Sequence, residues 1–211
     1  MNMSKDTNYI KALGSFLNYY ESDLEYIARF QKIIYRGIND EDLDGKKPGS
    51  FKAFINEYRV ARNISSSAEN ENNIKKLLEI TQKWIKSENA NDVDGLAEAI
   101  CKAGITPRNR TPVSLASKIL MLNNPWEILP MDSLTKASLK YSGTTYSGFK
   151  IELDKFKDNE ITRNLLTHQL AEIGRYLSPI ESQFKHCLKD IETIRYNRYA
   201  DKVLWVGLEN K

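Results

Sequence analysis

The chain has 211 residues, of which 41% are hydrophobic and 28% charged, and its formal net charge is +3. This composition suffices for one ordinary globular domain or two small ones, and it excludes a disordered or fibrous chain. No stretch approaches the roughly 18 consecutive apolar residues of a membrane helix, and the first residues lack the pattern of a signal peptide. We therefore expect a cytoplasmic protein without a membrane partner.

Cysteine and histidine are scarce, with two of each in the chain. Cys101 and Cys187 are far apart and lack the spacing of metal ligands, so we expect neither a metal site nor a disulfide framework. No motif demands a cofactor, and nothing in the pattern demands an oligomer. The expected state is a monomer without metal or cofactor.

Apolar residues recur with helical spacing along nearly the whole chain, whereas the two-residue alternation of strands is hardly visible. One apolar stripe contains Ile10, Leu13, Leu17 and Tyr20, and a second begins at Leu24 and ends at Tyr35. Further helices are expected over residues 51–58, 74–85, 93–103, 112–122, 132–141, 149–156, 161–173, 180–194 and 198–208. The sequence predicts an all-α fold of about nine to ten short helices.

Polar segments suggest how these helices are grouped into two packed helical subdomains. Residues 65–73, rich in Ser, Asn and Glu, form the best linker candidate, and residues 39–50 and 143–148 are expected loops. We expect residues 1–70 to pack with the C-terminal helices of 166–211. Residues 71–165 then form a core that contains a helix–hairpin–helix-like element near 93–122.

A basic turn lies between the helices expected at 93–103 and 112–122. No acidic residue occurs between Glu98 and Glu127. Helix N-terminal amides and arginine side chains together bind phosphate well, so we predict a DNA backbone contact here. The alternative is a solvated basic turn. Basic residues of this window are Lys102, Arg108, Arg110 and Lys118, and the candidate DNA-binding residues are Thr106, Arg108, Asn109, Arg110 and Ser117.

Two side chains near this turn are candidates for chemistry. Lys118 lies on the helix that follows the turn, and Asp132 begins the next helix. The mostly apolar segment between them brings the two together only if the chain doubles back at Asn124-Pro125. The alternatives are an exposed helix lysine and a helix N-cap that accepts from the amide of Leu134 or Thr135.

Several short segments resemble the helix–hairpin–helix DNA glycosylase superfamily, and in particular its bacterial 8-oxoguanine-glycosylase-like branch. They are Ser114-Leu-Ala-Ser-Lys-Ile-Leu, then Asn124-Pro125, and then Leu129-Pro130-Met131-Asp132-Ser133. The tail from Arg198 to Gly207, which contains Asp201-Lys-Val-Leu-Trp-Val-Gly207, is also similar to the end of that branch, which runs D-x-x-L-W-x-x-G. The remaining chain is similar only in length and helical character.

The resemblance implies an enzyme that grips DNA through the hairpin, flips one nucleotide into a pocket and cleaves its N-glycosidic bond. It assigns to Asp132 the stabilisation of positive charge on the sugar or the orientation of water. It assigns to Lys118 the attack on C1′ that forms a Schiff base in bifunctional members. The physics agrees, because a fixed carboxylate opposes an oxocarbenium charge and a neutral lysine is a nucleophile.

Other features of the chain bear on this resemblance. The family hairpin commonly carries Gly-x-Gly, but this turn has no glycine after Gly104, so the grip on phosphate shifts to the arginines. Residues 195–199 either line a nucleic-acid groove or form an ordinary amphipathic segment. Aromatic candidates for stacking on a flipped base are Trp126, Tyr141, Tyr146 and Trp205, and the alternative for each is a place in the core.

The sequence thus leads to one principal hypothesis and two alternatives. The principal hypothesis is a DNA glycosylase that excises a damaged or modified base, for repair or for defence against modified phage DNA. One alternative is a helical module that binds DNA without chemistry and whose affinity falls steeply with salt. The other is a helical protein-interaction domain.

Overall fold

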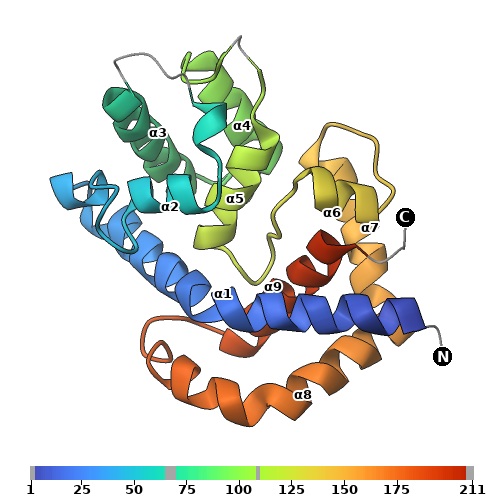
Figure 1. The fold of residues 1–211 in the computed structure, drawn as a ribbon. Coiled ribbons are helices and arrows are strands. Elements are labelled where there is room, and N and C mark those ends of the chain that lie inside the picture. The colour runs from blue at the N-terminus through green and yellow to red at the C-terminus, as the bar shows by residue number, and fades with distance from the viewer. Residues whose placement is uncertain (1–2, 65–69, 108–109, 208–211) are drawn as a thin grey trace. The chain divides into compact units, whose positions relative to one another are not determined.

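A computed structural model describes residues 3–64, 70–107 and 110–207 of the chain. This part is all-helical and contains no strand, which confirms the predicted fold class (Figure 1). None of its helices has both the length and the apolarity to cross a membrane. The α-helices are α1 (Met3–Arg36), α2 (Phe51–Glu57), α3 (Asn70–Ile85), α4 (Val93–Lys102), α5 (Val113–Asn123), α6 (Ser133–Ser138), α7 (Tyr146–Asp158), α8 (Glu160–Ser182) and α9 (Ile191–Val206). Two 3-10 helices are η1 (Asp40–Asp42) and η2 (Ala61–Asn63).

Several predicted elements differ from the structure, since residues 146–148 of an expected loop begin α7 and residues 70–73 of the expected linker begin α3. The two apolar stripes at the start belong to one helix, α1, of 34 residues. The helix expected over 180–194 was wrong, because α8 continues through Pro179 to Ser182 and α9 begins at Ile191. Pro179 has no amide hydrogen to donate to the carbonyl four residues earlier, yet α8 continues past it.

Contacts divide the chain into two compact units. The first consists of Met1–Leu24 with Pro125–Lys211, and the second of Glu25–Asn124. These divisions differ from the expected domain boundaries after residues 70 and 165, since α1 supplies residues to both units. The part of α1 that ends at Leu24 does belong to the same unit as the C-terminal helices.

The first unit is built on α9, against which α6 and α8 pack, while α7 packs on α8. The rings of Phe16 on α1 and Tyr199 on α9 lie 5.5 Å apart between centroids. The Ser138 hydroxyl donates to the Leu204 carbonyl and thereby joins α6 to α9. Other buried apolar residues of this core are Ala12, Tyr20, Leu24, Phe149, Leu153, Leu166, Leu177, Ile194 and Val203.

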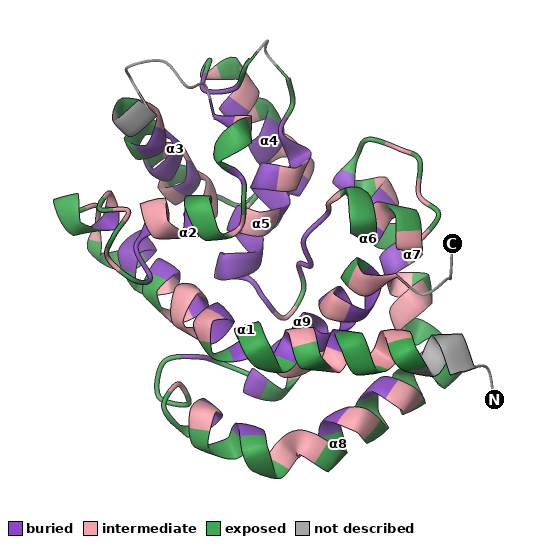
Figure 2. Ribbon diagram, in the orientation of Figure 1, coloured by how far each residue is buried: buried purple, intermediate pink, exposed green. Residues whose placement is uncertain are grey.

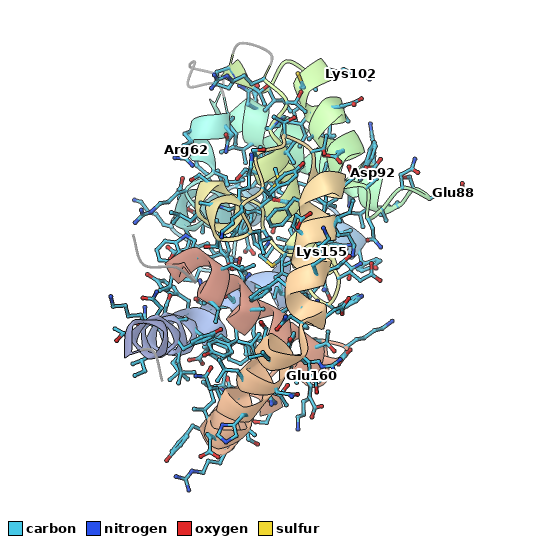
Figure 3. All side chains as sticks on the ribbon, turned by 90° about the vertical axis from the view of Figure 1, so that its right-hand side faces the viewer. Arg62, Glu88, Asp92, Lys102, Lys155 and Glu160 are labelled. Atoms are coloured by element: carbon cyan, nitrogen blue, oxygen red, sulfur yellow. The ribbon has the colours of Figure 1, made fainter. Side chains whose placement is uncertain are left out.

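The second unit packs α4 against both α3 and α5. Helix α5 is buried along most of its length, as Figure 2 shows. The side chain of Asp92 accepts from the amide of Gly95 at 2.9 Å and caps α4, whose ends Figure 3 marks with Asp92 and Lys102. Gln31 on α1 donates to the carbonyls of Leu122 and Asn123 at the end of α5. An aromatic cluster from α1 and α2 contains Tyr26, Phe30, Phe51, Phe54 and Tyr58.

Candidate functional site

The basic turn joins two helices that pack against each other, α4 and α5. Helix α4 ends just before Gly104, whose positive φ of 71° suits a residue without a Cβ. Arg110 is exposed, as a phosphate contact requires. Thr106 is buried, and its hydroxyl has no hydrogen-bond partner in the described part of the chain. Arg108 and Asn109, which we also predicted to bind DNA, lie outside the described residues.

Ser117 is a packing residue of α5. Its side chain is fully buried, and its hydroxyl donates to the Ser114 carbonyl at 3.1 Å. A phosphate cannot reach a hydroxyl that faces the core of its own unit. We therefore remove Ser117 from the predicted DNA contacts.

Lys118 follows Ser117 on α5 and is half-buried. Its ammonium donates to the carbonyl of Tyr58 at 3.1 Å, just beyond the end of α2. It is therefore not the solvated helix lysine of the alternative interpretation. For attack on C1′, the amine would have to lose a proton and leave this carbonyl.

Asp132 is the N-cap of α6, which confirms the capping interaction that the sequence suggested. Its Oδ1 accepts from the amides of Leu134 at 2.9 Å and Thr135 at 3.0 Å. The hydroxyl of Thr135 in turn accepts from the Asp132 amide at 2.9 Å. Within the described ranges, Oδ2 makes no hydrogen bond. Asp132 thus presents a half-buried carboxylate with one oxygen fixed and the other available.

A buried ionic cluster, formed by Asp23, Arg198 and Asp201, lies in the same unit. The Arg198 guanidinium is 2% exposed and donates from Nε to Asp23 Oδ2 at 2.8 Å. Its Nη1 lies 3.1 Å from Asp201 Oδ2. Burial raises the pKa of Asp201, and the charges of Asp132 and Asp23 raise it further, while Arg198 and Lys202 oppose the rise.

Our sequence interpretation missed this cluster, although the signal was present. Arg198 and Asp201 are three residues apart, which places them on one face of a helix. The groove suggested for residues 195–199 is not formed, because Arg198 and Tyr199 are buried. Arg195 instead pairs with Glu181 on α8 through two hydrogen bonds of 2.6 Å. From Asn197 to Asp201 every residue of α9 is buried, so this part of the helix is enclosed by its own unit.

The four aromatic candidates differ in exposure. Tyr146 is buried, and its hydroxyl donates to the Leu129 carbonyl at 3.0 Å and accepts from the Leu129 amide at 3.1 Å. It is a core residue, and we remove it from the predicted base pocket. Tyr141 and Trp126 are half-buried, and Trp205 is 47% exposed. These three and Asp132 belong to the first unit, whereas Lys118 belongs to the second.

The described residues contain no group of three or more His, Cys, Asp or Glu side chains arranged to hold a metal ion. Comparisons of the chain with protein-family models, with curated proteins and with solved structures found no match. Four features of the chain thus bear on its function. They are the Asp132 carboxylate, the Arg198 cluster, the partly exposed aromatic residues and the basic turn.

Proposed function

We propose that the protein is a DNA glycosylase that flips a damaged or modified base out of DNA and hydrolyses its N-glycosidic bond. The biological setting that we propose is DNA repair or defence against modified phage DNA. The observation that carries the proposal is the Asp132 carboxylate, because its position in the segment Pro130-Met131-Asp132-Ser133 matches the resemblance. Its local geometry also suits the chemistry.

Hydrolysis of an N-glycosidic bond requires stabilisation of positive charge on the sugar. As the bond from C1′ to the base nitrogen breaks, its electron pair leaves with the base and the sugar gains oxocarbenium character. A carboxylate held by the backbone stabilises that charge without reorganisation. The amides on Oδ1 provide this rigidity for Asp132, and Oδ2 is available to face C1′ or to accept a proton from the attacking water.

DNA binding in this proposal falls to the turn between α4 and α5. The absence of acidic residues between Glu98 and Glu127 makes the turn attractive to phosphates. Exposed Arg110 can form charge-assisted hydrogen bonds with two phosphate oxygens. Stacking on Trp126, Tyr141 or Trp205 would offset part of the few kcal/mol that base extrusion costs.

We assign the chemistry to Asp132 without a Schiff-base step. The hydrogen bond from Lys118 to the Tyr58 carbonyl supports a structural role for this lysine, namely joining α5 to the end of α2. The proposed enzyme is therefore monofunctional. It releases a free base and leaves an abasic site with an intact strand.

A base-release assay tests the proposal. The protein is incubated with duplexes that carry oxidised, alkylated or deaminated bases and with heavily modified phage DNA. Free base is measured by mass spectrometry, and abasic sites by alkaline cleavage. We expect release that falls at least about 100-fold in Asp132→Asn, the scale for loss of one fixed electrostatic group. Asparagine is itself a good N-cap, so this variant keeps α6.

Asp92→Asn is the matched control, since Asp92 caps α4 in the same way but lies outside the proposed chemistry. It should release base at the wild-type rate. Absence of release from every DNA would contradict the proposal, and salt-sensitive binding without release would indicate a DNA-binding module. A borohydride-trapped adduct that disappears in Lys118→Ala would show that the monofunctional assignment is wrong.

A further inference from the structure

The second unit contains a pocket beside the last turns of α1. Its volume is about 510 Å³, within the usual range of small-molecule sites. One wall is a face of α1, and the other is the chain from η1 to the start of α2. The residues that line it are Arg29, Lys32, Ile33, Arg36, Asn39, Glu41, Asp42, Lys47, Gly49 and Ser50.

The lining contains four cationic and two acidic side chains, so its net charge is positive. The pair between Arg36 and Asp42, at 2.6 Å, is part of the wall because the Asp42 side chain is 5% exposed. Lys47 pairs with Glu41, whose side chain is 67% exposed. Exposed pairs of this kind contribute little to stability, so an incoming anion can replace them at low cost.

Lys32 is the cation of this wall for which the described residues supply no acidic partner. Arg29, one turn earlier on α1, uses Nε and Nη2 for Glu25 Oε1 at 3.0 and 2.9 Å. Its Nη1 has no hydrogen bond within the described ranges. The wall therefore offers an ammonium and part of a guanidinium to a ligand.

Gly49 keeps the Arg29 side chain in this wall. Its φ is +73°, and a Cβ built there would lie 1.9 Å from Cδ of Arg29. Any larger residue at position 49 would displace the arginine. The glycine thus lets the aliphatic part of Arg29 lie directly against the loop.

We propose that this pocket binds a phosphate group, with Lys32 and Arg29 as its principal ligands. A lysine supplies a compact charge and an arginine a directional fork, and both form charge-assisted bonds with phosphate oxygens. The phosphate can belong to a mononucleotide. The same chemistry accepts a phosphodiester of DNA, so the source of the phosphate is resolved by experiment. The site is distinct from the basic turn and does not depend on glycosylase activity.

The test measures binding of 2′-deoxynucleoside 5′-monophosphates and of inorganic phosphate to the full chain by isothermal titration calorimetry. A parallel arm measures binding of an undamaged duplex oligonucleotide. We expect Lys32→Glu to weaken binding of the phosphate-bearing probe at least tenfold, and Arg29→Gln to weaken it several-fold. The matched control is Lys11→Glu, an exposed lysine of the same helix in the other unit with the same change of charge.

The arms distinguish the sources of phosphate. If Lys32→Glu abolishes binding of the mononucleotide, the pocket is a nucleotide site. If Lys32→Glu weakens binding of the duplex alone, the pocket is a second contact for the DNA backbone. The proposal is overturned if neither probe depends on Lys32. It is also overturned if Lys11→Glu weakens binding as much as Lys32→Glu, because the effect would then reflect net charge alone. Circular dichroism of each variant verifies that its helices are intact.

Discussion

Arg198 is the largest fully buried side chain in the described structure, and it illustrates how charge is accommodated in the first unit. Its guanidinium contacts one carboxylate from α1 and one from its own helix. Burying an ion is costly unless its partners and hydrogen bonds are in place. Removing Arg198 would therefore leave two buried carboxylates without their cation, and the cluster restricts how α1 and α9 can pack.

Single-residue chemistry was predictable from sequence where it is local. The capping role of Asp132 follows from its position before a helix, and the structure confirms it. The pairing of Arg198 with Asp23 was not predictable, because 175 positions separate them in sequence. The burial of Ser117 was missed for the same reason, since its neighbours are set by packing, whereas a core position was the stated alternative for Tyr146.

At this scale, Asp201 gives a pH-dependent prediction. Its pKa is raised in the folded protein, chiefly by burial. Between the unfolded value of about 4 and the raised folded value, the native state binds more protons, so this residue lowers stability as pH rises. Asp201→Asn removes that dependence. We expect the free energy of unfolding of the variant, relative to wild type, to increase as pH rises above about 4.

Urea denaturation at several pH values measures this difference. The matched control is Asp158→Asn, since Asp158 is an exposed carboxylate of the same unit. This control measures how far the change from Asp to Asn at an exposed site alters unfolding on its own. A constant difference for Asp201→Asn over the same range would contradict the raised pKa.

Helical periodicity predicted the elements well and their orientation less well. In α1, the buried series is Ala12, Phe16, Tyr20, Leu24 and Ile27. The predicted stripes included Ile10 and Tyr35, which are 70% and 75% exposed. Apolar residues occupy adjacent rows of this long helix, so spacing alone does not identify the buried row. Which row is buried depends on the helices that cover it.

Two helix glycines give opposite predictions at this scale. Gly174 in α8 has open space where a Cβ would lie, whereas a Cβ on Gly95 in α4 would lie 2.8 Å from the Trp84 ring. Alanine favours a helix over glycine by up to about 1 kcal/mol. We therefore expect Gly174→Ala to raise Tm by about 2–4 °C. Gly95→Ala should lower it, because the new Cβ would displace both the Asp92 carboxylate that caps α4 and the Trp84 ring of α3.

Thermal unfolding followed by circular dichroism measures both variants, and each serves as the control of the other. The chemical change is identical, so a common propensity effect would move both Tm values in the same direction. A rise in Tm for Gly95→Ala would show that the contact between α3 and α4 adapts without cost. A fall for Gly174→Ala would show that its surroundings are occupied.

At the scale of the whole molecule, sequence predicted two helical groups but not their limits. The linker-like residues 65–73 suggested a boundary, yet the second unit continues from Glu25 to Asn124. One division falls inside α1, where a continuous helix gives no compositional signal, and the other falls between Asn124 and Pro125, where the sequence predicted only the end of a helix. Net charge is equally uninformative about binding surfaces. A value of +3 does not locate an anion site until the ion-pair partner of each cation is known.

This division predicts a difference in autonomous folding between the two units. The second unit is one continuous segment, and its aromatic cluster and the packed helices α3, α4 and α5 all lie within it. The first unit is discontinuous. Without residues 3–24, the segment 125–211 lacks the buried side chains Phe16, Tyr20 and Leu24 and leaves Arg198 without Asp23.

We therefore expect residues 25–124, expressed alone, to show helical circular dichroism and a cooperative thermal transition. Residues 125–211 alone should lack such a transition and should regain it when a synthetic peptide of residues 3–24 is added. The same peptide with Asp23→Asn and Phe16→Ala is the control, and it should restore little, because it removes an ion partner and a core ring. Cooperative unfolding of 125–211 without any peptide would show that α1 covers this unit without being needed for its fold.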